Sequence, residues 1–290
     1  ALPILLFSEQ FSEKIRVSMG IAWYPEDGED LETLLNSADF ALYEVKFSFD
    51  KNLIQDTLDF ESFKHHYSKE FDNIIEGNSI TFAYQPIVSA KDGSVLGYEM
   101  LMRIFSEIIN SLRKLMMIGK IYSKTHLIES ITFTRAFEEY NYNLERFQGM
   151  KIFVNSISSI ILADKTLKQI AKPYSNNLDM LVVEIKDFGD AEEETLMNKI
   201  EVLKKYEAEF LIDGFEGDVK YFDKIGFYPH YVKIDLSIIN NIHKDLYHQK
   251  ELNKILDYCK KNGVKTIAFG IKSLEEMKYL IKAGVEDRKS

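Results

Sequence analysis

Five polar side chains end apolar runs in the second part of this 290-residue sequence. Glu99 lies late in VLGYEMLM, Asn155 ends KIFVN, Glu184 ends LVVE, Asp213 ends FLID and Asp235 ends VKID. If these runs are parallel strands, their carboxyl ends meet at one edge of a sheet or one mouth of a barrel. Each residue alone would serve as a helix N-cap after its strand. Five in phase favour a functional site.

The first four of these residues supply three carboxylates and an amide oxygen. Such hard oxygen donors suit Mg²⁺, Mn²⁺ or Ca²⁺ better than a structural zinc. Buried together without a cation, the carboxylates would repel one another strongly. The sequence therefore predicts that either a metal binds there or several of the acids are protonated.

The elements that must position these residues alternate along the chain. Helical patterns at 191–207, 246–262 and 274–283 lie between short apolar runs, and Ser273 with Glu276 forms a capping box. Gly263 and Gly284 stand where helix C-caps belong. Alternation over ~220 residues predicts an α/β fold, a (β/α) barrel with a parallel sheet. The predicted strands are 80–88, 95–102, 151–157, 180–185, 210–212, 231–234 and 266–269.

The first block, residues 1–48, contains strand formers at 15–23, a turn at 24–28 and a helical pattern at 31–45. It is too small to bury much core alone and is read as the tail of a domain. Residues 49–70 are charged and helix-compatible, which predicts a helical linker to the main domain at 71–290.

Composition excludes several classes. The formal net charge of −10 argues against binding DNA, because no basic excess exists to neutralise phosphates. No apolar run reaches the ~18–20 residues that span a bilayer. The single cysteine, Cys259, cannot form an internal disulfide, which favours a reducing cytoplasm.

At this point the motifs match a known family. The second block resembles the EAL domain, the cyclic-di-GMP phosphodiesterase fold of bacteria, and the first block resembles the end of a GGDEF (diguanylate cyclase) domain. The cyclase signature itself is absent, so no cyclase activity is expected in this chain. The matching segments are Gln85-Pro86-Ile87-Val88, Glu99 to Arg103 (ExLxR), Val154-Asn155-Ser156, Val183-Glu184-Ile185 and Lys233-Ile234-Asp235, with 18–22 and 38–46 in the first block.

The resemblance implies a two-metal hydrolysis of a phosphodiester. Its first metal would be held by Glu99, Asn155, Glu184 and Asp213, and Asp213 would bridge to a second ion. Lys233 would orient or deprotonate the attacking water, with Asp235 as an acid partner. Gln85 and Arg103 would contact the dinucleotide, Arg103 at a phosphate.

Departures from the family pattern are concentrated at this site. Gly214 replaces a second aspartate, Phe269 and Lys272 replace two acids of a late strand, and Lys186 replaces a threonine. The loop at 216–219 and the segment after Arg103 also diverge. These changes remove negative charge, so we expect one Mg²⁺ or Mn²⁺ at most. The chain ends where the family continues, which leaves open a barrel without its last strand and helix.

The sequence therefore predicts a degenerate EAL domain that acts as a cyclic-di-GMP receptor or as a regulatory scaffold for other signalling domains or proteins. The alternative is an active or weak phosphodiesterase that produces pGpG. A homodimer remains open.

Overall fold

The computed structural model divides the chain into two compact units, Ala1–Asp72 and Asn73–Ser290, which are described separately. Within the ranges below, the side chains of 4–8, 11–15, 60–66 and 219–221 are not described. The structure describes residues 4–8, 11–15, 19–28, 30–31, 33–35, 37–38, 41–42, 60–77, 79–147, 149–186, 192–215 and 219–289.

The first unit contains an antiparallel hairpin of β1 (Ile4–Ser8) and β2 (Phe11–Ile15). The strand predicted over 15–23 is wrong for residues 19–23, which are irregular. A strand needs a hydrogen-bonded neighbour, whereas Trp23 N donates to the side chain of Asp27 at 2.7 Å. The predicted helix at 31–45 is confirmed for its described residues, and α2 (Phe60–Glu76) forms part of the predicted linker helix. Residues 16–18 and 43–59 of these predictions lie outside the described ranges.

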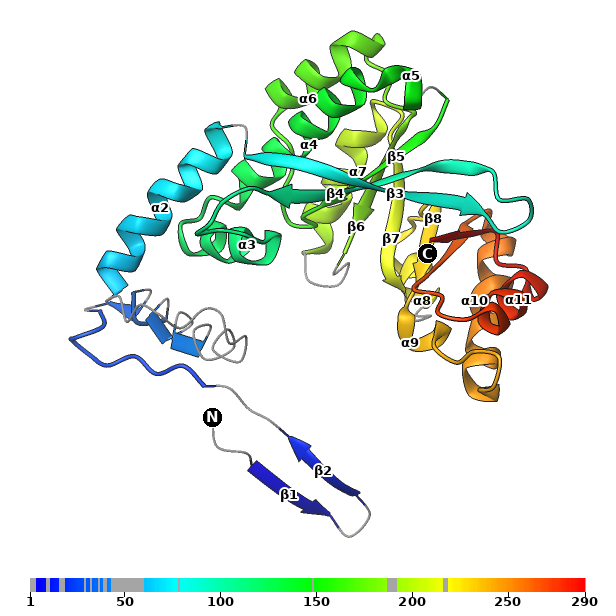
Figure 1. The fold of residues 1–290 in the computed structure, drawn as a ribbon, viewed down its shortest axis with the longest axis horizontal. Helices are drawn as coiled ribbons and strands as arrows, with labels where there is room; N and C mark the ends of the chain where they lie inside the picture. Colours follow the sequence, from blue (N-terminus) through cyan, green and yellow to red (C-terminus); the bar gives the residue numbers. More distant parts are fainter. Residues whose placement is uncertain are drawn as a thin grey trace. The chain divides into compact units, whose positions relative to one another are not determined.

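The second unit is a closed barrel of eight strands in the order β10-β3-β4-β5-β6-β7-β8-β9, which confirms the predicted fold class (Figure 1). The sheet is not wholly parallel, since β3 runs antiparallel to both of its neighbours. The strands are β3 (Ile80–Ser89), β4 (Val95–Ile104), β5 (Lys151–Ser156), β6 (Leu181–Ile185), β7 (Glu209–Phe215), β8 (Tyr231–Ile234), β9 (Lys265–Phe269) and β10 (Asp287–Lys289).

The sequence left open a barrel without its last strand, and the structure shows that β10 closes the barrel. This strand has only three residues, yet Lys289 pairs with Phe269 of β9 in parallel and with Ile87 of β3 in antiparallel register. Its sequence, Asp-Arg-Lys, carries no apolar run. The sequence pattern therefore gave no signal for a strand at the position where the barrel closes.

Helices follow most of the parallel strands. The three helices predicted near the end of the chain are confirmed, and so is the capping box of Ser273 and Glu276. Gly263 and Gly284 end α10 and α11 with φ of 69° and 100°, as predicted. The helices are α3 (Leu112–Ile121), α4 (Thr125–Tyr142), α5 (Leu144–Phe147), α6 (Asp164–Ala171), η1 (Lys172–Tyr174), α7 (Glu193–Lys204), α8 (Val219–Ile225), α9 (Leu236–Ile239), α10 (Leu246–Asn262) and α11 (Leu274–Ala283).

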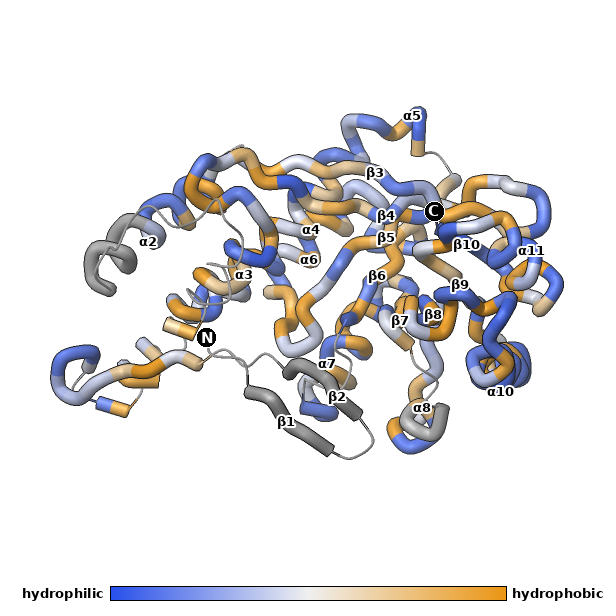
Figure 2. Tube along the Cα trace, turned by 60° about the horizontal axis from the view of Figure 1, so that its bottom comes forward, coloured by the Kyte–Doolittle hydropathy of each residue, from blue (hydrophilic) through white to orange (hydrophobic). Residues whose placement is uncertain are grey.

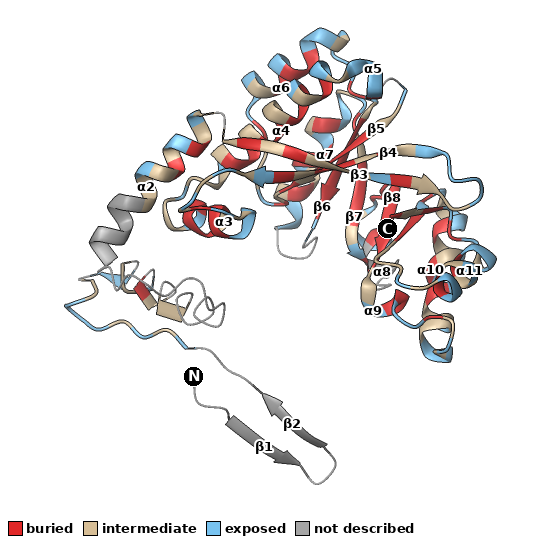
Figure 3. Ribbon diagram, viewed as in Figure 1, coloured by how far each residue is buried: buried red, intermediate tan, exposed pale blue. Residues whose placement is uncertain are grey.

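Burial follows the layers of this unit. The residues of β6 and β8 are all buried (Figure 3), whereas α10 consists largely of hydrophilic residues (Figure 2). None of the helices in the described part of the chain has the length and apolar character that a bilayer crossing requires. Inside the barrel, one apolar cluster is formed by Ile87, Phe153, Val182, Leu211, Tyr231 and Ile267.

Candidate functional site

A second layer of side chains lies inside the barrel, beyond the apolar cluster. Because side chains alternate along a strand, residues two positions apart face the same side. Counting two positions from each cluster residue toward the carboxyl ends of the parallel strands gives a mostly polar set. The set consists of Asn155, Glu184, Asp213, Lys233 and Phe269, and Glu99 on β4 and Lys289 on β10 join it through their contacts.

Lys233 is the centre of this layer. Its Nζ lies 3.1 Å from Glu99 Oε2 and 3.6 Å from Asp213 Oδ1, and it also contacts Glu184 Oε1. The Lys233 side chain is 2% exposed. The structure thus brings together three of the four residues predicted as metal ligands, around an ammonium group.

Two further lysines contact the same carboxylates. Lys289 Nζ contacts Glu99 Oε2, and Lys186 Nζ lies 3.2 Å from Asp213 Oδ2. Three lysines therefore face three carboxylates, and their formal charges balance. Lysines therefore relieve the predicted repulsion between the carboxylates, whereas the sequence suggested a metal or protonated acids.

The electrostatics of the layer follow from burial and these contacts. Burial raises the pKa of Glu184 to about 7, although Lys233 works against this. Burial also acts to raise the pKa values of Glu99 and Asp213, but their lysine partners prevail and lower both. Burial disfavours the charged form of Lys233, yet Glu184, Glu99 and Asp213 raise its pKa to about 12. With these carboxylates around it, Lys233 is therefore an ammonium at neutral pH.

The same residues can be tested for their fit to a divalent cation. The donor set is all oxygen, and Glu184 Oε2 is buried without a hydrogen-bond partner, which suits a cation. Ammonium groups, however, contact Glu99 Oε2, Glu184 Oε1 and both oxygens of Asp213. Within the described ranges, no group of three or more His, Cys, Asp or Glu side chains has the arrangement of a metal site. As arranged, the layer does not fit the metal.

The other predicted site residues lie around this layer. Asn155 Nδ2 donates to Glu99 Oε1 at 3.4 Å, so its amide nitrogen faces the carboxylate. Asp235 caps α9 by accepting a hydrogen bond from Ser237 N at 2.8 Å, which is the helix N-cap role that the sequence analysis gave as the alternative to a functional site. Gln85 is paired with Glu99 in the β3–β4 ladder. Arg103 is exposed near the carboxyl end of β4, and its Nη1 donates to the carbonyls of Leu101 and Met102 at 3.2 and 3.0 Å.

The departures from the family pattern also take definite positions. Gly214 has φ of 70°, a left-handed conformation that an aspartate adopts at a cost, and the β7–β8 register shifts beside it. The Phe269 ring lies 5.9 Å from Lys233 Nζ. Phe269 therefore places an apolar ring beside the ammonium of Lys233. Residues 187 and 216–218 lie outside the described ranges.

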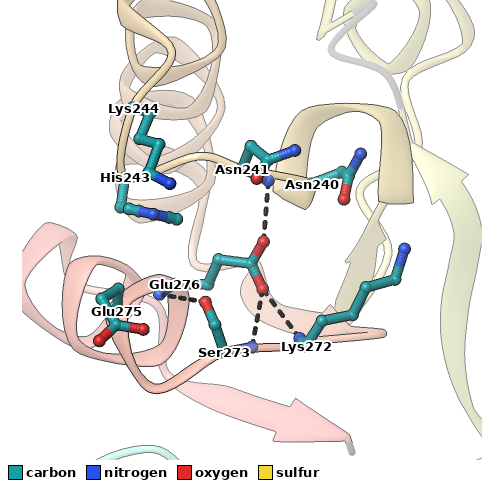
Figure 4. A pocket seen from close by; sticks show the side chains of 8 residues that line it. All are labelled: Asn240, Asn241, His243, Lys244, Lys272, Ser273, Glu275 and Glu276. Atoms are coloured by element: carbon teal, nitrogen blue, oxygen red, sulfur yellow. Dashed lines mark hydrogen bonds between the residues drawn. The ribbon is translucent and has the colours of Figure 1, made fainter.

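The connection between α9 and α10, together with the loop after β9 and the start of α11, borders a pocket of about 510 Å³ that is lined by polar residues (Figure 4). Glu276 joins these loops, because its carboxylate accepts from the backbone nitrogens of Asn241, Lys272 and Ser273. Lys244 and Lys272 contribute the cationic side chains of the lining. This pocket therefore lies beside the carboxyl ends of two barrel strands.

The sequence analysis missed a buried ion pair that supports the strand bearing Asn155. Lys199 on α7 and Glu129 on α4 meet at 2.7 Å with side chains 0% and 1% exposed. Lys199 also donates to the carbonyls of Ile157 and Ile160, and Glu129 accepts from Ser156 Oγ and Ile157 N. The pair fixes the chain directly after Asn155. A lysine on an amphipathic helix gives no sequence signal for such burial.

The structure thus defines an α/β barrel protein with a cluster of ionisable groups at the carboxyl ends of its strands. A family model described as the EAL domain matches residues 68–286. The chain therefore belongs to the EAL domain family.

Two curated relatives match shorter stretches. An uncharacterized signaling protein of Caulobacter vibrioides is 34% identical over 92 residues, which cover 30% of this chain and 11% of that protein. The biofilm architecture maintenance protein MbaA of Vibrio cholerae is 30% identical over 109 residues, which cover 33% of this chain and 12% of MbaA. The matched region thus spans only about a tenth of each relative.

Solved structures share the fold at low identity. The FimX EAL domain of Xanthomonas citri in complex with c-diGMP has a TM-score of 0.67 at 14% identity, covering 79% of this chain and 92% of that one. Vibrio cholerae LapD S helix-GGDEF-EAL bound to c-di-GMP has a TM-score of 0.65 at 17% identity, covering 91% of this chain and 66% of that one. Klebsiella pneumoniae BlrP1 in a manganese/cy-diGMP complex has a TM-score of 0.61 at 16% identity, covering 74% of this chain and 55% of that one.

Proposed function

We propose that this chain is a bacterial cyclic-di-GMP signalling module whose EAL domain does not hydrolyse the nucleotide. It acts either as a receptor that binds cyclic-di-GMP or as a regulatory scaffold. The observation that carries the proposal is the bonding of Lys233 to all three carboxylates that would serve a metal. Lys186 takes the other oxygen of Asp213, the residue that would bridge two ions. Two-metal hydrolysis requires carboxylate oxygens that face the ions.

Nucleotide binding finds support outside this layer. Arg103 presents an exposed guanidinium near the carboxyl end of β4, and guanidinium groups suit phosphate oxygens. The relatives also support signalling. The FimX and LapD structures contain c-di-GMP, and MbaA is a biofilm architecture maintenance protein. Residues 1–48 are proposed to be the end of a GGDEF domain, joined through 49–70 to the EAL domain at 71–290. The likeness to LapD S helix-GGDEF-EAL, which covers 91% of this chain, supports that order.

The alternative is a weak Mg²⁺- or Mn²⁺-dependent phosphodiesterase. One observation favours it: Glu184 Oε2 is buried without a hydrogen-bond partner, and such an oxygen is costly unless something binds it. That reading requires the lysines to leave the carboxylates when the metal and the nucleotide arrive.

The deciding experiment incubates the purified chain with cyclic-di-GMP and Mn²⁺ and looks for linear pGpG. We expect no product above that of the Glu99→Ala variant. Product that forms with the native chain and disappears with Glu99→Ala would establish the phosphodiesterase instead.

Calorimetric titration with cyclic-di-GMP in the presence of EDTA separates the two forms of the proposal. A receptor binds the nucleotide and weakens on Arg103→Ala. A chain that gives no heat at high nucleotide concentration leaves the scaffold, with other signalling domains or proteins as its partners.

A further inference from the structure

Lys289 occupies an unusual position for a lysine. It belongs to the strand that closes the barrel, between Phe269 of β9 and Ile87 of β3, and it is 9% exposed. In β10, Asp287 and Lys289 are buried while Arg288 between them is only partly so. Alternation therefore turns Lys289 into the barrel, toward the layer that holds Glu99.

The partner of Lys289 is Glu99, and that carboxylate is fully engaged. Its Oε2 contacts both Lys289 Nζ and Lys233 Nζ, and its Oε1 accepts from Asn155. Glu99 is 2% exposed, so water offers it little alternative solvation. A buried carboxylate held by two ammonium groups is already neutralised and bonded, as a carboxylate on a divalent ion would be.

We propose that Lys289 is an internal counter-ion that takes the place of a divalent cation at Glu99 and excludes such a cation from the barrel. The barrel is then assembled and charge-balanced without metal, and removal of the Lys289 ammonium opens a cation site made by Glu99 and Glu184. This inference deepens the proposed function, on which it rests, by naming a second residue beside Lys233 that keeps the metal away from Glu99.

The exclusion is electrostatic. A divalent ion on Glu99 would face the Lys289 ammonium that contacts the same carboxylate, and its repulsion from that group is twice that between two unit charges at the same distance. Lys233 alone leaves Glu184 Oε2 without a partner, so an oxygen suited to an incoming ion already exists nearby. Lys289 is thus a second ammonium group, besides Lys233, that an ion at Glu99 Oε2 would meet.

The test titrates Mn²⁺ into the full chain at neutral pH without nucleotide and follows free Mn²⁺ by electron paramagnetic resonance. We expect no stoichiometric binding by the native chain. Lys289→Met should bind one Mn²⁺ at least ~10-fold more tightly than the native chain, since one repelling charge is removed from a buried site. Lys282→Met, an exposed lysine in the last turn of α11, is the matched control and should behave as native.

The double variant Lys289→Met with Glu99→Gln locates the site. It should lose the gained Mn²⁺ binding, because the carboxylate that the lysine released is no longer charged. A Lys289→Met protein that is folded by circular dichroism and binds no Mn²⁺ would overturn the proposal. Stoichiometric Mn²⁺ binding by the native chain that Glu99→Gln abolishes would overturn it as well.

If Lys289→Met does not fold, Lys289→Gln takes its place in the same titration, because glutamine keeps a hydrogen-bond donor to Glu99 without the charge. That variant should show the same gain in Mn²⁺ affinity and lose it when Glu99→Gln is added. The outcome is separable from the proposed function. The chain can bind cyclic-di-GMP in EDTA even if Lys289→Met gains no Mn²⁺ binding. Conversely, Lys289→Met can gain Mn²⁺ binding even if the chain binds no cyclic-di-GMP.

Discussion

Replacing Lys233 by methionine should lower the free energy of unfolding of the EAL domain far more than replacing an exposed lysine would. The ammonium lies 3.1 Å from Glu99 and 3.6 Å from Asp213, and it also contacts Glu184. At an effective dielectric constant of about 20, each such contact is worth roughly 4 kcal/mol gross. Desolvation of the ammonium offsets most of this, so we expect a net loss of about 3–5 kcal/mol in the free energy of unfolding.

The assay is urea unfolding followed by circular dichroism, with thermal unfolding in parallel. The predicted loss corresponds to a fall of about 6–20 °C in Tm, at about 2–4 °C per kcal/mol for a domain of this size. Lys254→Met is the matched control, because Lys254 forms an exposed pair with Glu251 at 2.6 Å. Exposed pairs of this kind contribute about 0.3–0.5 kcal/mol.

The deficit should also depend on pH, and its sign follows from the carboxylates left behind. Glu184 already has a pKa raised to about 7, and loss of Lys233 raises it further. A carboxyl whose pKa is higher in the folded state stabilises the fold at low pH and loses that contribution as the pH rises through the folded pKa. The Lys233→Met deficit should therefore be larger at about pH 8 than at about pH 5.5. A loss below about 1 kcal/mol, or one independent of pH, would refute the view that Lys233 neutralises this cluster.

Three further predictions concern other parts of the EAL domain. Lys199→Met should cost about 3–5 kcal/mol in urea unfolding, because it leaves Glu129 buried without its cation, and Lys199→Met with Glu129→Gln should recover part of that loss. Arg103→Ala should weaken cyclic-di-GMP binding in calorimetry by about 1.5–3 kcal/mol and reduce its salt dependence, if the guanidinium contacts a phosphate. Cys259 should resist iodoacetamide in the folded chain and react in urea, as judged by mass spectrometry, because burial raises its pKa to about 12.

The barrel strands and their carboxyl-end residues could be predicted because two independent patterns coincide there. Short apolar runs between helical patterns mark the strands, and the last polar residue of each run marks the mouth. Phe153 with Asn155 and Val182 with Glu184 illustrate this, since a core residue and a site residue lie two positions apart on one strand. The same spacing carries Lys233 beyond Tyr231.

The closing strand and its lysine could not be predicted in this way. Asp287 to Lys289 is short and charged, so neither hydrophobic alternation nor propensity distinguishes it from a surface loop. Its strand character comes from the two open edges of β3 and β9, which only the assembled barrel provides. The Lys199–Glu129 pair is a similar case, because burial of an ion pair depends on packing between α4 and α7 rather than on local sequence.

The lysine contacts also change what the retained acids mean. Glu99, Glu184 and Asp213 match the metal ligands expected from the family pattern, and that match alone would suggest an active hydrolase. In this barrel, however, each of them is a partner of a lysine, and two of those lysines are buried. Removing any one acid would weaken the pairing of an ammonium that cannot reach water, at a cost of several kcal/mol. The three carboxylates thus have a structural role that is sufficient without catalysis, so their presence is no argument for hydrolysis in this chain.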